Sequence, residues 1–342
     1  MTEPKRYKWE VCVTSWTYNH APYIVDTMNG FCMQETDFPF VCTIVDDCST
    51  DGEPEVIRRY LEENFKYRDG SEVNNVETDD YLLTFAQHKT NSNCFFAVFF
   101  LKYNHYQVKK NKLPYLKEWR ESANYLAICE GDDYWIYPQK LQMQVDFLNN
   151  NPDYSLVHTD FDLVEGKRHH WKEIFPDGNY FPGIFHNNVN IGTLTTLFRF
   201  STYASLQHSY IGKGWPMGDY PLWIEFSHAA KIKYFNLVTA KYRILQKSAS
   251  HSSDINQLIK FKNVGVEVRH FYVNLYNVQL AHGGLSKKYY IDIMRYAYRL
   301  KDKKTAKVYF KKALQNRLLT YKTIIYFLGV FSSLLRRVIG EH

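Results

Sequence analysis

The chain has 342 residues, which at roughly 150 residues per domain indicates two domains. Hydrophobic residues make up 45% of it, enough to bury a sizeable core, so the composition excludes an intrinsically disordered protein. The formal net charge of +6 is too small to indicate a nucleic-acid-binding protein.

The positive charge is concentrated near the C-terminus. Residues 285–342 hold 14 Lys and Arg and three acidic residues, a net of +11. The rest of the chain is therefore mildly acidic, at about −5. We expect a basic C-terminal region attached to an acidic body.

Cysteine spacing and apolar runs bear on the location of the protein. The six cysteines show no CxxC pair and no zinc-type spacing, so we expect buried, reduced thiols. The N-terminus lacks the apolar stretch of a signal peptide. The charge-free run Thr323–Leu335 has 13 residues, too few to span a bilayer. These features predict a cytoplasmic protein, with peripheral association at the inner face of the membrane left open.

The N-terminal part of the chain alternates strand and helix patterns. Val11–Ser15 and Val41–Val45 are short apolar runs, as expected of strands buried on both faces. Pro22–Met33 and Glu53–Phe65 are predicted helices, and acidic residues crowd the first turn of the second, where the helix dipole favours them. This order predicts a parallel sheet with right-handed crossovers.

The pattern continues through the middle of the chain. We predict a strand at Tyr81–Phe85, a helix at Cys94–Tyr103, a surface insertion at Lys109–Trp119, a strand at Tyr125–Cys129 and a helix at Pro138–Asn149.

Further strands and one helix are predicted before the helical C-terminus. They are a strand at Tyr154–His158, a loop region at Gly166–Asn190, a strand at Leu194–Phe198, a helix at Gly218–Ala230 and two short strands within Ile232–Tyr242. Beyond about Asp254 we expect three or four helices and no strands. The predicted division is an α/β domain over 1–253 and a basic, amphipathic helical region over 254–342.

Acidic residues follow two of the predicted strands directly. Asp46 and Asp47 follow one, and Glu130, Asp132 and Asp133 follow another. Because ligands of open α/β sheets bind outside the carboxyl ends of the strands, both clusters are expected at one edge. A single pair of aspartates is also common in turns and helix caps.

Carboxylates gathered in this way repel one another unless a cation lies among them. Oxygen ligands without a His/Cys set favour Mg²⁺ or Mn²⁺, which complete their coordination with substrate phosphate oxygens. The chemistry indicated is transfer from a phosphorylated or nucleotide-activated donor.

Several motifs in order resemble the family 2 glycosyltransferases, which have the GT-A fold. They are TYNHAPYI (Thr17–Ile24), Gln34, VDDCSTDG (Val45–Gly52), CEGDDYW (Cys129–Trp135), PQKLQMQVDFLNNNP (Pro138–Pro152) and MGDYPLW (Met217–Trp223). The resemblance covers roughly Lys8–Arg243. It implies a GT-A, Rossmann-like core with a mostly parallel central sheet, followed here by the helical region.

The resemblance implies roles for residues at the first two motifs. Thr17, Tyr18, Asn19 and Asp47 would hold the nucleotide base and ribose, with Asp46 in support. Tyr18 offers a face on which a base can stack, and Asp47 can accept hydrogen bonds from a base edge.

The metal motif of the family corresponds to Glu130-Gly131-Asp132, with Glu in place of the usual first Asp. Asp132 is the expected metal contact. Glu130 is expected nearer the ribose or sugar, and Asp133 would steady either residue.

The resemblance also implies an acceptor side. Asp219 matches the catalytic base, although an acidic residue at the start of a helix is equally an N-terminal cap. Thr195 and Arg199 in GTLTTLFR, and Trp223 in MGDYPLW, are expected on the acceptor side.

One late element departs from the family. The YRxH motif reads Tyr242-Arg243-Ile244-Leu245, without its His. Either His251 replaces it, as a phosphate-side or metal residue, or Arg243 and Lys247 neutralise the phosphate.

Lys and Arg alternate with large apolar residues in the C-terminal region. Arg317–Val338 has a broad apolar face with basic ends, which suits an anionic membrane surface. The alternatives are a helical bundle over the core or a dimer interface.

The sequence as a whole predicts a metal-dependent, inverting glycosyltransferase. Its partners would be a nucleotide-sugar donor, with UDP-sugars the first expectation, and a glycan or lipid-linked saccharide acceptor of surface polysaccharide synthesis. No nucleic acid is expected. A nucleotidyltransferase and a catalytically silent binding protein of similar fold remain alternatives.

Overall fold

The computed structural model describes residues 8–66, 74–164, 166, 168–169, 173–185, 191–245, 254–279 and 284–339. By their internal contacts these residues form two compact units. The first takes in the described residues up to Tyr180, with 191–208 and 225–243. The second takes in 181–185, 209–224, 244–245 and 254–339.

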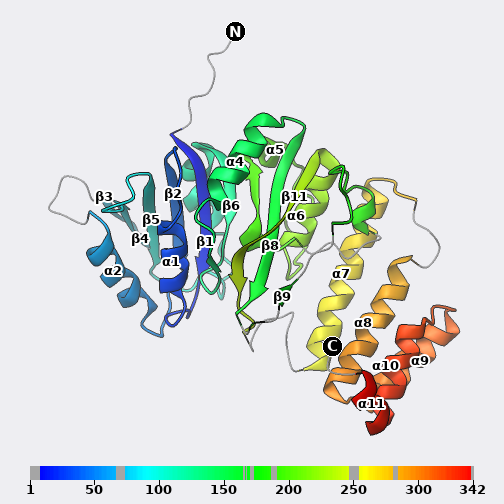
Figure 1. Cartoon of the computed structure of the whole chain (residues 1–342). Coiled ribbons are helices and arrows are strands. Elements are labelled where there is room, and N and C mark those ends of the chain that lie inside the picture. Colours follow the sequence, from blue (N-terminus) through cyan, green and yellow to red (C-terminus); the bar gives the residue numbers. More distant parts are fainter. Residues whose placement is uncertain are drawn as a thin grey trace. The chain divides into compact units, whose positions relative to one another are not determined.

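The first unit is built on one mixed sheet of eleven strands (Figure 1). Ten of them lie in the order β3-β4-β5-β2-β1-β6-β10-β8-β11-β7, and β9 pairs with β8. The strands are β1 (Trp9–Thr17), β2 (Phe40–Asp46), β3 (Asn74–Glu77), β4 (Tyr81–Gln87), β5 (Cys94–Leu101), β6 (Ala123–Ile128), β7 (Tyr134–Trp135), β8 (Tyr154–Leu163), β9 (Arg168–His169), β10 (Leu197–Arg199) and β11 (Lys231–Tyr242).

The parallel sheet predicted for the N-terminal part is confirmed. β5, β2, β1 and β6 are neighbours and run parallel. Antiparallel strands flank this centre, because β4 pairs with β5 on one side and β10 inserts between β6 and β8 on the other. The centre is the parallel core of the GT-A-like α/β fold that we expected.

Helices connect and follow these strands. They are α1 (Ile24–Cys32), α2 (Glu53–Asn64), η1 (Leu113–Leu116), α3 (Lys117–Glu121), α4 (Lys140–Asn150), η2 (Gly183–Phe185), η3 (Thr193–Thr195), α5 (Phe200–Ser205) and α6 (Asp219–Ala229). The buried apolar residues are Ile24, Met28 and Phe31 in α1 and Ile57, Tyr60 and Leu61 in α2. The two helices also touch each other, since Tyr60 Oη donates to Asn29 Oδ1 over 2.7 Å.

A helix predicted at Cys94–Tyr103 is wrong, because this segment is strand β5. Seven of its eight residues in CFFAVFFL are buried, and β5 lies between β2 and β4. A short run that is apolar on both faces has no helical or strand period to distinguish the two states.

Two other predictions differ in detail. Ile232–Tyr242, predicted as two short strands, lies in the single strand β11, whose register against β8 shifts between Tyr234 and Val238. The predicted strand Leu194–Phe198 divides into η3 and β10.

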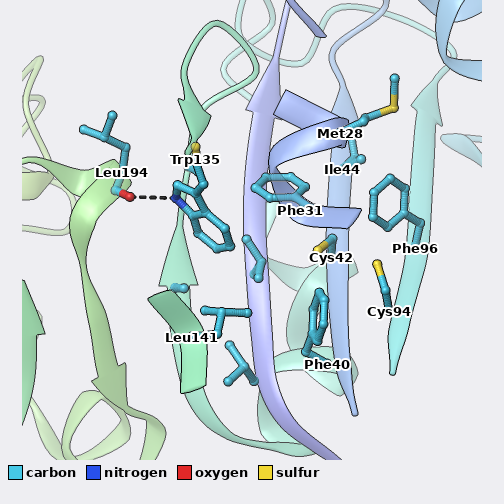
Figure 2. Close-up of a cluster of buried hydrophobic side chains, with 14 of the residues drawn as sticks. Met28, Phe31, Phe40, Cys42, Ile44, Cys94, Phe96, Trp135, Leu141 and Leu194 are labelled. Carbon is cyan, nitrogen blue, oxygen red and sulfur yellow. Dashed lines mark hydrogen bonds between the residues drawn. The ribbon is translucent and has the colours of Figure 1, made fainter. Parts of the chain in front are cut away.

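The main core of the first unit lies between α1, α4 and the sheet (Figure 2). Phe31 of α1 packs edge-on against Trp135, with ring centroids 5.0 Å apart, and against Phe96 of β5. Trp135 Nε1 donates to the carbonyl oxygen of Leu194 over 2.7 Å, so this buried indole is satisfied. A Cβ at Gly30 would lie 2.8 Å from the Trp135 amide nitrogen, so only glycine allows this approach.

The second unit contains a helical bundle (Figure 1). Its helices are α7 (Ile255–Leu275), α8 (Gly284–Leu300), α9 (Lys303–Gln315), α10 (Tyr321–Phe331) and α11 (Ser333–Ile339), so the described residues beyond Asp254 form five helices where we expected three or four. Side-chain caps start three of them: Asp254 for α7, Asp302 for α9 and Thr320 for α10. Within the described ranges, no helix is long and apolar enough to cross a membrane.

Candidate active site

The carboxyl ends of three neighbouring parallel strands, β2, β1 and β6, meet at one edge of the sheet. The loops that follow them are joined by backbone hydrogen bonds. Asp47 N donates to Thr17 O, and Gly131 N donates to Trp16 O, each over 3.0 Å. The two acidic clusters therefore lie at the same edge, as the strand pattern predicted.

Gly131 brings the loop after β6 against the loop after β1. A Cβ on this residue would lie 2.2 Å from Thr17 Oγ1 and 2.5 Å from Thr17 Cβ. Real Cβ atoms do not approach so closely, so the glycine between Glu130 and Asp132 is required by packing.

Glu53, the first residue of α2, is a site residue that sequence reasoning missed. It is fully buried, and its carboxylate accepts from Thr17 Oγ1, from His20 N over 2.8 Å and from Ser49 Oγ over 2.8 Å. From the sequence, Glu53 is interpreted only as an acidic residue in the first turn of a helix, where the helix dipole favours it. The sequence also places it next to turn-forming segments rich in hydroxyl groups, and this could have indicated its role.

Three expected nucleotide-binding residues lie at the end of β1 or directly after it. The Thr17 side chain is buried, and its hydroxyl donates to the Glu53 carboxylate. Asn19 has φ of 57° and its Oδ1 accepts from Thr50 N over 2.8 Å, which ties the two loops together. Tyr18, 39% exposed, keeps a ring surface available for stacking.

Asp46 is buried at the end of β2, and its Oδ1 accepts from Ser49 N over 3.2 Å. Burial, together with the charges of Glu53 and Asp47 and against the hydrogen bonds from Ser49, raises the pKa of this carboxyl to about 6.

The Asp47 carboxylate is occupied by protein groups. It accepts from His105 N over 2.7 Å, from Tyr106 N over 3.2 Å and from Lys112 Nζ over 2.9 Å. All three donors belong to the segment 104–112, which overlaps the predicted surface insertion. Asp47 therefore positions this segment over the end of β2, and a base would share its oxygens with these donors.

Glu130, Asp132 and Asp133 occupy the loop after β6. Glu130 Oε2 accepts from Thr193 Oγ1 over 3.0 Å, which links this loop to η3. Asp133 is buried and accepts from Arg243 N over 2.8 Å. Burial, with the charges of Asp132 and Glu130, raises the pKa of the Asp133 carboxyl to about 9.

The Asp132 carboxylate is half-buried and, within the described part of the chain, forms no hydrogen bond or ion pair. Among the described residues no three His, Cys, Asp or Glu side chains converge on a point that could hold a metal ion. Mg²⁺ and Mn²⁺ commonly use one or two protein carboxylates and take their other oxygens from phosphate and water. The carboxylates at this edge therefore fit a cation that binds together with a phosphorylated substrate.

Arg243, expected on the donor phosphates, is committed to the acidic loop. Its Nη1 donates to Asp132 O over 2.6 Å, and its Nη2 pairs with Asp26 of α1. Its guanidinium lies over the rings of Tyr23 and Tyr134, at 4.9 and 4.7 Å from the centroids. These contacts make Arg243 a clamp on the acidic loop, and its place on the donor phosphates stays a prediction.

Two expected acceptor residues are structural. Thr195 is fully buried and its Oγ1 donates to Gly192 O over 2.7 Å. In the sheet, Arg199 lies opposite Tyr125, near the beginning of β6. Because β10 runs antiparallel to β6, this position is away from the acidic edge. Its Nε donates to Tyr154 O over 2.8 Å. Both side chains thus have structural partners, and their acceptor role stays a prediction.

Asp219 and Trp223 lie in the part of α6 that belongs to the second unit. Asp219 is the first residue of the helix, as predicted, and is exposed. Desolvation by the protein around it nevertheless raises the pKa of its carboxyl. Trp223 is 2% exposed, and its place on the acceptor side stays a prediction. His251 and Lys247 lie outside the described residues.

Residues 12–76 match the family model described as glycosyl transferase family 2. This segment of the chain belongs to a family 2 glycosyltransferase domain. The matched segment of this domain begins in β1 and includes Thr17, Asp46, Asp47 and Glu53.

The curated relatives include uncharacterised proteins of Mycobacterium bovis and of two strains of Mycobacterium tuberculosis. Each is 31% identical over 141 residues, which cover 41% of this chain and 32% of the relative. The chain thus spans about a third of the length of these relatives.

Two solved structures are similar to the chain over most of its length. One is residues 1–349 of TarS from S. aureus in complex with UDP-GlcNAc, at 14% identity and a TM-score of 0.49, covering 94% of this chain and 92% of that one. The other is a mannosyltransferase from Pyrobaculum calidifontis in complex with GDP-Man and Mn²⁺, at 15% identity and a TM-score of 0.48, covering 95% and 86%. At these identities and TM-scores, the ligands of the two structures are not assigned to this chain.

Proposed function

We propose that the chain is an inverting glycosyltransferase that moves a sugar from a nucleoside-diphosphate donor to an acceptor hydroxyl. The observation that carries this proposal is the Asp132 carboxylate, which has no partner among the described residues and follows β6 at the edge where β1 and β2 also end. The family 2 match over the strands and loops of the same edge supports it.

The donor would lie across the loops after β1, β2 and β6. Tyr18 would stack on the base, Asn19 and Asp46 would contribute polar contacts, and Asp47 would hold the segment 104–112 in place. Glu130 and Asp132 would face the sugar and the diphosphate. We propose a UDP-sugar as the donor on the basis of the family resemblance.

Mg²⁺ or Mn²⁺, when bound at Asp132, would offset the charge that builds on the departing diphosphate. Asp133 would support this residue from its buried position, and Arg243 would hold the loop through its bond to Asp132 O. The fixed loop presents one carboxylate outward and buries the next.

Asp219 would accept the proton of the acceptor hydroxyl. The acceptor oxygen then attacks the anomeric carbon from the face opposite the diphosphate. The bond between that carbon and the diphosphate oxygen breaks, and the configuration at the anomeric carbon inverts. A pKa raised above the ordinary aspartate value makes this carboxylate a stronger base, which supports the assignment. The acceptor proposed is a glycan or lipid-linked saccharide of surface polysaccharide synthesis, met in the cytoplasm.

Replacing Asp219 tests the mechanism. We expect Asp219→Asn to reduce turnover by at least about a thousandfold, as loss of a general base does, while nucleotide affinity measured by calorimetry stays the same. Asp302→Asn is the matched control, because Asp302 is also an acidic residue at a helix N-terminus and its side chain accepts from Thr305 N. Equal turnover in the Asp219 variant and the control would assign Asp219 to helix capping alone.

The role of the cation is tested by the same calorimetric measurement of nucleotide binding. Asp132→Ala should weaken UDP binding in the presence of Mn²⁺ and leave the weaker, chelator-resistant binding unchanged. Product analysis separates the proposed reaction from nucleotidyl transfer, since release of a nucleoside diphosphate supports it and release of pyrophosphate contradicts it.

A further inference from the structure

Helix α10 has an apolar face that the described residues leave exposed. Its buried residues, Thr323, Gly329 and Val330, face α8 and α9. At 100° per residue, five exposed residues fall on the opposite side of the helix. They are Tyr321, Ile324, Ile325, Leu328 and Phe331, between 40% and 69% exposed.

Helix α11 adds to this surface. Leu334 and Val338 are 71% and 78% exposed, and Leu335 is 38% exposed. We call these eight residues of α10 and α11 the apolar face. A row of large side chains at this spacing is unusual on a surface that meets water alone.

Basic side chains border the apolar face directly. Lys307 Nζ lies 5.7 Å from the ring centroid of Phe331, and Lys322 Nζ lies 5.9 Å from that of Tyr321. Arg337 is exposed on α11. No acidic residue occurs between Lys303 and Ile339, where the basic residues are Lys303, Lys304, Lys307, Lys311, Lys312, Arg317, Lys322, Arg336 and Arg337.

We propose that the apolar face docks on an anionic membrane surface. The apolar side chains would enter the boundary between headgroups and acyl chains, and the bordering lysines and arginines would bind lipid phosphates. A second copy of the chain fits less well, because two such faces would bring like charges together. With 11 residues, α10 has about half the length of a membrane-spanning helix, so it would lie in the plane of the surface.

Vesicle sedimentation of the full chain tests this docking. We expect binding to vesicles of equal parts phosphatidylcholine and phosphatidylglycerol, much weaker binding to pure phosphatidylcholine, and loss of most binding between about 0.1 and about 1 M salt. Leu328→Glu should weaken binding about tenfold or more, because a buried leucine becomes a charge facing anionic lipid.

Leu275→Glu is the matched control. Leu275 ends α7 and is 43% exposed, against 46% for Leu328, and it lies outside the apolar face. Its variant should bind vesicles as the original chain does. Circular dichroism and UDP binding of both variants confirm folding, and neither readout depends on turnover.

Three outcomes would overturn the docking surface. They are no binding of the original chain to the anionic vesicles, equal binding of the Leu328 variant and the control, and a concentration-dependent dimer that Leu328→Glu dissociates. The last would assign the apolar face to a second copy.

Discussion

Burial determines the state of the acidic residues at the sheet edge more than their order in the sequence does. Asp46, Asp132 and Asp133 look alike in the sequence, yet Asp133 has a pKa of about 9, Asp46 has one of about 6, and Asp132 is half-exposed. The strand pattern predicted where these residues gather. It could not predict which are desolvated, because that depends on side chains from distant segments.

Asp46→Asn should stabilise the fold in a pH-dependent manner. Well below pH 4 the carboxyl is protonated in both the folded and the unfolded state, so its burial adds no charge penalty. Well above pH 6 it is ionised in both states, and the penalty is complete. The free energy of unfolding of the variant should therefore exceed that of the original chain by roughly 1–3 kcal/mol at pH 8, and by less at pH 5.

Urea denaturation at both pH values measures this difference. An equal increment at pH 5 and pH 8 would show that a lost charge is not its cause. Donor binding should weaken in the same variant, because Asp46 is a proposed donor contact.

At the scale of elements, the segment 104–112 shows what a single sequence can and cannot predict. It overlaps the surface insertion predicted at Lys109–Trp119 from its basic composition, and Lys109–Asn111 are exposed as expected. Its attachment to Asp47 arises from two backbone amides and Lys112, and backbone donors leave no trace in the sequence. The strand β5 was missed for a related reason, since its burial on both faces comes from β2 and β4.

Lys112→Ala should loosen this segment. Lys112 Nζ pairs with the buried Asp47 and lies 5.2 Å from the ring centroid of Trp16, so its loss leaves a desolvated carboxylate with fewer donors. We expect a loss of roughly 1–3 kcal/mol in the free energy of unfolding and faster proteolysis within 104–112. Lys110→Ala is the control from the same segment, because its pair with Asp80 lies at the surface, where solvent screens it, and its loss should change the free energy of unfolding much less. Equal effects of the two variants would contradict this account.

At the scale of the whole molecule, the sequence correctly separated an α/β part from a helical C-terminus. The boundary at 253/254 stays a prediction. The compact units cross it, because residues 181–185 and 209–224 join the helices while 225–243 return to the sheet. Contacts between segments so far apart in the chain leave no periodic pattern of hydrophobic residues in the sequence, so the sequence could not predict them.

The helical unit has a core of its own, centred on α8. Met294→Ala removes a fully buried side chain there and should lower the free energy of unfolding by about 2–5 kcal/mol. Hydrogen exchange should then be faster in α8 and in α10, which packs on it. Met33→Ala, at an exposed methionine, should leave both rates unchanged. Unaltered exchange in α10 would show that it does not share this core.

The contact of Gly131 with Thr17 has a consequence for ligand affinity. Two loops that interlock so closely have little freedom to rearrange separately, so the conformational entropy of ordering them is lost when the chain folds and not when a ligand arrives. A group that engages either loop therefore meets both in their final arrangement. Neither a nucleotide nor a cation would then have to order these loops on binding, and each would bind more tightly for that reason.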